Sequence, residues 1–146
     1  MPAARHDTLI DASPDQVMAV ITDFESYPKF LPEMETARII KRDGDVWDVA
    51  FSVRIVRSFS YTLQLRRVSP TQLKWHLVEG AFKVNEGGWN LDEVDDGART
   101  KAVYTIDLQL GMFVPGNILR SLVERSLPDT VSRFKGETER RVAVGA

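Results

Sequence analysis

The sequence predicts an α+β fold, in which a curved antiparallel sheet of about seven strands wraps around one long C-terminal helix. Between positions 35 and 110, apolar and polar residues alternate in several runs, which is typical of strands with one buried face. From Pro115 to about Arg141 the apolar residues instead recur at spacings of three and four, which indicates a helix with one apolar stripe. Two short helices are expected after the first strand.

The N-terminal part predicts the first strand and these two helices. Residues 4–11 have little apolar content, which favours a strand at the edge of the sheet. Ser13 is expected to cap a helix that begins at Pro14, and Gln16 completes a capping box. The aromatic segment 23–32 contains two prolines, which forbid one continuous helix, so we expect a kink and a second short helix there.

The middle of the chain predicts the sheet. Short turns at 43–45, 69–71 and 95–97 favour antiparallel pairing of neighbouring strands. Gly87 and Gly88 fall inside a strand, where paired glycines predict a bulge or a sharp bend. The alternation assigns one inward-facing set to each run: Trp47, Val49, Phe51, Val53 and Ile55; Phe59, Tyr61, Leu63 and Leu65; Leu73, Trp75 and Leu77; Trp89 and Leu91; Tyr104, Ile106, Leu108 and Leu110.

The C-terminal helix is expected to begin at Asn117, which can cap it. Pro128 should lie on its outer face. The apolar stripe that should face the sheet consists of Ile118, Leu119, Leu122, Val123, Leu127, Val131 and Phe134.

Composition limits the classes of function. A chain of 146 residues predicts one domain, residues 1–146, and a formal net charge of −2 gives no attraction to nucleic acid. The chain contains no cysteine, which excludes disulfides and cysteine metal sites and is compatible with a cytoplasmic location. The polar N-terminus lacks a signal-peptide core, and no apolar run approaches the ~20 residues of a membrane span.

No motif of nucleotide, metal or nucleophilic chemistry occurs. The two histidines, His6 and His76, are not at metal-ligand spacing, and His76 alternates with apolar residues so that it should face out. Walker, dinucleotide-binding and nucleophile-elbow signatures are missing from the sequence. No metal, no cofactor and no catalytic residue are therefore predicted.

Three motif groups carry a resemblance to a known family: Ile10-Asp11-Ala12-Ser13-Pro14; Asp23-Phe24 with Tyr27-Pro28 and Phe30-Leu31-Pro32; and Gly80-Ala81-Phe82-Lys83 followed by Gly88-Trp89-Asn90-Leu91. Their order resembles the START-like superfamily with its helix-grip fold. Within it the chain is similar to the polyketide cyclase/dehydrase and lipid-transport group, near the coenzyme-Q-binding branch. The resemblance implies a pocket for a hydrophobic molecule between the sheet and the long helix.

The candidate site combines inward aromatic residues with a few polar anchors, for which we expect Tyr61, Tyr104 or Glu79. Glu79 shares the phase of Leu73, Trp75 and Leu77, which predicts an inward carboxylate near a strand end, either at the rim of the pocket or as a polar anchor inside it. The loop 111–116 and the segment 27–32 should lie near the mouth of the pocket. The predicted ligand-binding residues are Tyr27, Phe30, Leu31, Trp47, Phe51, Tyr61, Leu63, Trp75, Glu79, Phe82, Trp89, Tyr104, Leu119, Leu122 and Val123.

The main functional prediction is a non-enzymatic binder or carrier of a lipid, a prenylated quinone or a polyketide-like aromatic. One alternative is a polyketide aromatase/cyclase, which needs an inward ionisable residue that the sequence does not clearly offer. A further alternative, implied by the resemblance, is a macromolecular interaction module of the ribosome-associating toxin type. The expected partner is a hydrophobic small molecule, without nucleic acid; transient membrane contact and any oligomeric state remain open.

Overall fold

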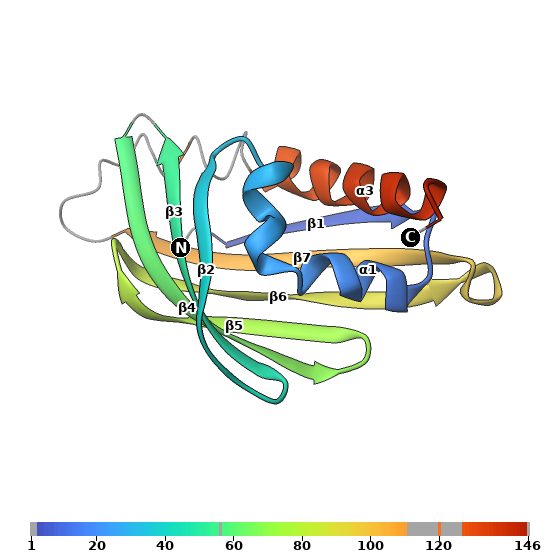
Figure 1. Ribbon diagram of the computed structural model, residues 1–146, viewed down its shortest axis with the longest axis horizontal. Helices are drawn as coiled ribbons and strands as arrows, with labels where there is room; N and C mark the ends of the chain where they lie inside the picture. The colour runs from blue at the N-terminus through green and yellow to red at the C-terminus, as the bar shows by residue number, and fades with distance from the viewer. Residues whose placement is uncertain (1–2, 56, 111–119, 121–126, 146) are drawn as a thin grey trace.

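The computed structural model describes residues 3–55, 57–110, 120 and 127–145 (Figure 1). The elements in chain order are β1 (Ala3–Ile10), α1 (Pro14–Ile21), the 3-10 helix η1 (Phe24–Lys29), β2 (Met34–Asp43), β3 (Val46–Ile55), β4 (Arg57–Ser69), β5 (Gln72–Gly80), β6 (Phe82–Val94), the 3-10 helix η2 (Asp95–Gly97), β7 (Arg99–Leu110) and α3 (Leu127–Ala143).

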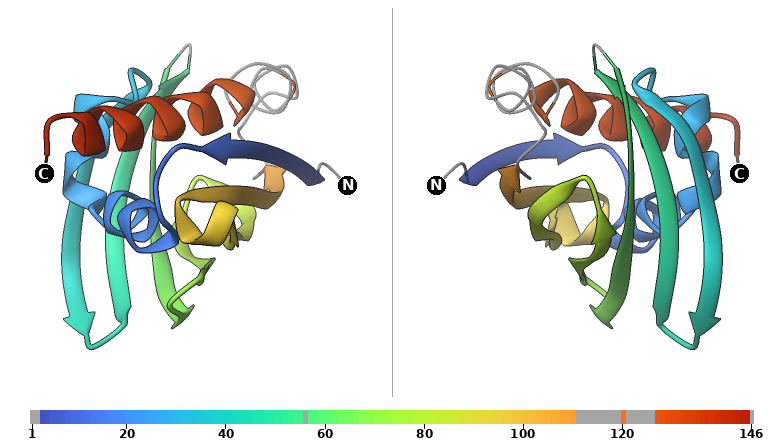
Figure 2. Two further views of the ribbon diagram at one scale, coloured as in Figure 1. Left: turned by 90° about the vertical axis from the view of Figure 1, so that its right-hand side faces the viewer. Right: turned by 90° about the vertical axis from the view of Figure 1, so that its left-hand side faces the viewer.

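The seven strands form one antiparallel sheet in the order β1-β7-β6-β5-β4-β3-β2, so β1 is an edge strand as predicted. The sheet is curved, and α3 lies across its concave side, with α1 and η1 beside it (Figure 2). The predicted α+β architecture, a curved sheet around a C-terminal helix with two short helices after the first strand, is confirmed.

Local sequence signals explain the two short helices. The Ser13 hydroxyl accepts from the Gln16 backbone at 3.3 Å, and the Gln16 side chain accepts from the Ser13 backbone at 2.9 Å, which confirms the capping box. The segment after α1 forms a 3-10 helix that contains Pro28. This tighter helix turns the buried Phe24 and Tyr27 toward the sheet.

The predicted alternation holds along the strands. The inward members of β3, β4, β5, β6 and β7 whose side chains the structure describes are buried or half-buried, and His76 is exposed as expected. Hydrogen-bonded register places Phe51 opposite Tyr61 and Trp89 opposite Tyr104 on the concave face.

The two glycines of β6 mark a close approach of backbones and not a bulge. Gly87 and Gly88 pair in regular register with Ile106 and Thr105 of β7. A Cβ atom on Gly87 would lie 2.1 Å from the Thr105 carbonyl oxygen, which explains why the strand needs glycine there. The ladder between β5 and β6 ends at the pair Trp75 and Gly87. Beyond this pair, β5 continues its pairing with β4 on its other edge.

Helix α3 presents Leu127, Val131, Phe134 and Thr138 to the interior, and Pro128 is exposed as predicted. The predicted cap at Asn117, the stripe residues before position 127 and the loop 111–116 lie outside the described residues. The described part of α3 places the buried Phe134 against Trp89 of β6.

Candidate functional site

A cavity of about 140 Å³ lies between the concave face of the sheet and α3. Its walls come from η1, from strands β2 to β7 and from the first turns of α3. The described residues that line it are Tyr27, Leu31, Glu33, Met34, Phe51, Val53, Tyr61, Leu63, Leu65, Leu73, Trp75, Phe82, Asn85, Trp89, Tyr104, Ile106, Leu108, Leu127, Thr130 and Phe134. Most are apolar or aromatic, as in sites that bind small organic ligands.

Aromatic rings pack against one another around this cavity. Phe134 makes edge-to-face contacts with Tyr27 and Trp89, at centroid distances of 5.1 and 5.3 Å. Tyr104 contacts Trp89 at 4.8 Å and Trp75 at 5.6 Å. Such contacts fix ring orientations, so the walls of the cavity are largely preformed.

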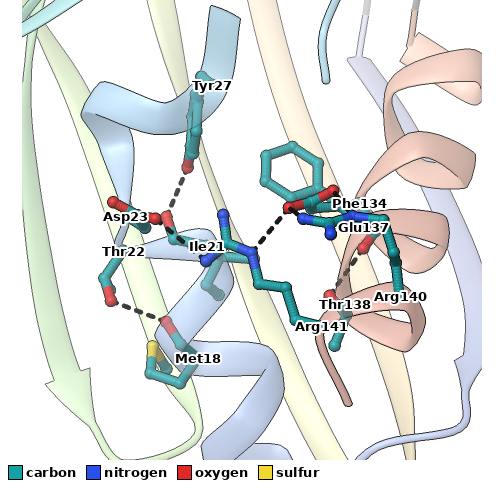
Figure 3. Close-up of polar contacts among 10 residues, drawn as sticks. All are labelled: Met18, Ile21, Thr22, Asp23, Tyr27, Phe134, Glu137, Thr138, Arg140 and Arg141. Carbon is teal, nitrogen blue, oxygen red and sulfur yellow. Dashed lines mark hydrogen bonds and ion pairs between the residues drawn. The ribbon is translucent and has the colours of Figure 1, made fainter. Parts of the chain in front are cut away.

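Three tyrosines bring hydroxyl groups to the cavity. Tyr27 donates to the Ile21 carbonyl oxygen at 2.5 Å (Figure 3), whereas the hydroxyls of Tyr61 and Tyr104 bond to no described residue. Burial raises the pKa of all three tyrosines well above the ordinary value for a phenol. They therefore stay neutral near pH 7 and can donate hydrogen bonds to a ligand, but none can serve as a base there.

One amide, one carboxyl and the hydroxyl of Thr130 complete the polar lining. Asn85 is buried, and its side-chain oxygen accepts from the Trp75 indole nitrogen at 3.2 Å. Glu33 is half-buried, and it is the one carboxylate among the described lining residues. Glu33 lies in the turn between Pro32 and the first residue of β2, outside any alternating run, so the periodicity of the sequence did not single it out. Asn85 could have been found by continuing the alternation backwards from Trp89.

Most predicted ligand-binding residues that the structure describes lie at the cavity: Tyr27, Leu31, Phe51, Tyr61, Leu63, Trp75, Phe82, Trp89 and Tyr104. Two do not line it. Trp47 is buried against Phe24, with ring centroids 5.4 Å apart, and Phe30 packs on Tyr27 and Phe134. Both belong to the surrounding core. The predicted Leu119, Leu122 and Val123 lie outside the described residues.

The expectation that Glu79 points into the pocket is wrong. Leu77 pairs with Leu63, but Glu79 pairs with Thr62, so Val78 is an extra residue on β5. A bulge of this kind shifts the alternation by one and sends the following side chain to the other face. Glu79 is accordingly exposed and lies in a groove on the outer side of the sheet.

Ion pairs tie the C-terminal half of α3 to the corner between α1 and η1 (Figure 3). Arg141 donates to Asp23 at 3.0 Å and to Glu137 at 2.7 Å. Glu139 accepts from the Asp11 backbone at 2.9 Å. Because Asp23 precedes the segment that carries Tyr27, these contacts hold α3 against one wall of the cavity.

Glu137 should give the protein a measurable acid sensitivity. Hydrogen bonds from Arg140 and Arg141 lower the pKa of Glu137 from 4.5 to about 2. A carboxyl whose pKa is lower in the folded state stabilises the fold above its unfolded pKa, and this stability is lost as the pH falls from about 4.5 toward 2. Glu137→Gln should therefore flatten the fall in the free energy of unfolding over this range.

Urea titrations at pH 5, 4 and 3 measure this effect. Asp43→Asn, a change at an exposed carboxyl in the β2–β3 hairpin, is the matched control and should leave the slope unchanged. An equally steep loss of stability in Glu137→Gln would show that other carboxyls account for the acid sensitivity.

Two further observations concern metal ions and membranes. Among the residues that the structure describes, no group of three or more histidines, aspartates or glutamates could hold a metal ion. No helix in the described part of the chain is long and apolar enough to cross a membrane.

Comparison with known proteins gives a consistent picture of the fold. The aromatase/cyclase Zhui from Streptomyces sp. R1128 superposes with a TM-score of 0.84 at 21% identity, over 97% of this chain and 95% of that one. A START superfamily protein from Mycobacterium smegmatis gives 0.83 at 20% identity, over 94% and 97%. At these identities the similarity shows the helix-grip, START-like fold.

Sequence comparison adds a relative and a family. The ribosome association toxin RatA of Escherichia coli K12 is 28% identical over 99 residues, which cover 67% of this chain and 63% of the toxin, so the chain matches less than two thirds of that relative. The profile of the family described as polyketide cyclase / dehydrase and lipid transport matches residues 10–135. The chain therefore belongs to the polyketide cyclase/dehydrase and lipid-transport family.

Proposed function

We propose that the protein binds a hydrophobic small molecule in the cavity between the sheet and α3 and releases it chemically unchanged. The observation that supports this most directly is the character of the lining, which is apolar except for neutral hydrogen-bond donors and one carboxyl. Membership of the family is consistent with binding of a hydrophobic ligand or with cyclase activity.

The size of the cavity favours a ring as the buried part of the ligand. Its volume of about 140 Å³ is close to that of an engineered apolar cavity of about 150 Å³ that accepts benzene. Sites for drug-sized ligands are larger, at about 300–1,000 Å³. We therefore favour a prenylated quinone or a polyketide-like aromatic, whose ring would enter the cavity, over a lipid that offers only a chain.

Native mass spectrometry of the purified protein, followed by titration with a short prenylated quinone and a fatty acid, tests this proposal. We expect a micromolar dissociation constant for the quinone and a change in tryptophan emission, because Trp75 and Trp89 line the cavity. Leu63→Phe should fill the cavity and weaken binding, whereas His76→Phe adds the same ring on the exposed face and should not. Absence of any response to a broad hydrophobic panel would contradict the proposal.

A polyketide aromatase/cyclase is the second candidate, and Glu33 is the observation that supports it. An acid–base residue is needed to promote aldol closure and dehydration of a poly-β-keto chain, and Glu33 is the one carboxylate among the described residues that line the cavity. Incubation with a polyketide mimic separates the two candidates. Turnover that is lost in Glu33→Gln but kept in Glu79→Gln would favour the enzyme over the binder.

Ribosome association is a third candidate, which rests on the similarity to RatA. The net charge of −2 gives it no electrostatic support. Sedimentation of the protein with ribosomal subunits through a sucrose gradient, at low and at physiological salt, would test it independently of ligand binding.

A further inference from the structure

Trp75 and Asn85 form a buried polar pair where strands β5 and β6 diverge. The ladder between these strands ends at Trp75 and Gly87, and Asn85 lies two positions further along β6. The indole nitrogen of Trp75 donates to the side-chain oxygen of Asn85 at 3.2 Å. The two side chains are 8% and 4% exposed, and both line the cavity.

This contact fixes the orientation of the Asn85 amide. An indole N–H can only donate, so the atom of Asn85 that faces it must be the oxygen, and the NH₂ group must point elsewhere. Of the bonds formed by the described residues, none starts from this NH₂ group. The NH₂ nitrogen is not among the fully buried side-chain atoms that lack a partner, so its donors stay accessible where Asn85 lines the cavity.

We infer that the NH₂ group of Asn85 binds an acceptor oxygen of the ligand, so that the cavity selects ring compounds that carry a carbonyl group. This inference rests on the proposed function and names the class of ligand. Trp75 acts as a positioning residue, since it holds the amide with its donors free for the ligand.

The neighbouring tyrosines add affinity but not this selectivity. The hydroxyls of Tyr61 and Tyr104 are neutral, and a hydroxyl can both donate and accept. They can therefore serve a ligand alcohol as well as a ligand carbonyl. The amide nitrogen of Asn85 can only donate, so a compound with no acceptor at that place leaves it unpaired.

Two compounds of the same shape provide the test. Acetophenone and α-methylstyrene share one heavy-atom skeleton and differ by a carbonyl oxygen in place of a methylene group. Their dissociation constants are measured by calorimetry for the wild type and for Asn85→Leu, which keeps the size of the side chain. We expect the preference for acetophenone over α-methylstyrene to fall by about three- to tenfold in Asn85→Leu, the range of one neutral hydrogen bond.

A second readout needs no substitution. In ¹⁵N-edited spectra of the wild type, the side-chain NH₂ signals of Asn85 should shift on titration with acetophenone and stay in place with α-methylstyrene. In Trp75→Phe the amide loses the donor that orients it, so the preference for acetophenone should fall while α-methylstyrene still binds.

The results separate this inference from the function on which it rests. One outcome is that both compounds bind while the preference for acetophenone is unchanged in Asn85→Leu and the NH₂ signals of the wild type do not shift with acetophenone. In that case the carbonyl inference is overturned and the binding function stands. If neither compound binds, the carbonyl inference is overturned, whereas the binding function fails only if the broad hydrophobic panel also gives no response.

Discussion

Replacing Phe134 by alanine should lower the free energy of unfolding by about 3–5 kcal/mol, the range for deleting a buried aromatic side chain. Phe134 is 3% exposed and joins three structural parts through its ring. It contacts Tyr27 and Phe30 of the η1 segment at 5.1 and 5.2 Å, and Trp89 of β6 at 5.3 Å. Denaturant unfolding followed by tryptophan emission measures the loss.

Phe30→Ala is the matched control for this prediction. Phe30 is half-buried, contacts Tyr27 and Phe134 with its ring, and does not line the cavity. Its removal should cost less, and only Phe134→Ala should gain extra thermal stability from benzene, because only that change enlarges the cavity. A loss below about 1 kcal/mol in Phe134→Ala would mean that neighbouring rings collapse into the space.

The sequence could predict the faces of the strands because the side-chain period of a strand is fixed at two. Once Trp75, Trp89 and Tyr104 were assigned to one phase, a common concave surface followed, and the structure brings them into contact. The capping box at Ser13 was equally accessible, because both of its partners lie within one helical turn.

What alternation could not predict were the events that interrupt it. The extra residue at Val78 turns Glu79 outward, and no feature of the local pattern marks that insertion. The pattern also assigns a residue to a face without saying which helix covers it. Trp47 therefore lies on the predicted face of the sheet. It packs against Phe24 at the corner between α1 and η1, however, and does not face the cavity. The alternating pattern did not identify Asn85 and Glu33 as polar residues of the cavity, because both lie just outside the alternating runs from which the strands were predicted.

Gly87→Ala should destabilise the protein by several kcal/mol, on the order of 3–4, through overpacking against a neighbouring backbone. The added Cβ would lie 2.1 Å from the Thr105 carbonyl oxygen and 2.9 Å from the Ile106 Cα atom. Both belong to the backbone of β7, so no rotation of a side chain can relieve the clash. Since Gly87 is also the last residue of β6 that pairs with β5, the strain should weaken the ladder beside Trp75.

Gly136→Ala tests the same substitution where space is free. Gly136 lies inside α3, is exposed, and has no atom within 4 Å of the added Cβ position. Alanine loses less backbone entropy than glycine on forming a helix, so this variant should gain about 0.5–1 kcal/mol. Chemical denaturation of both variants should thus give changes of opposite sign. A mild effect in Gly87→Ala would show that β6 and β7 can separate at this point, and the close approach would then not require glycine.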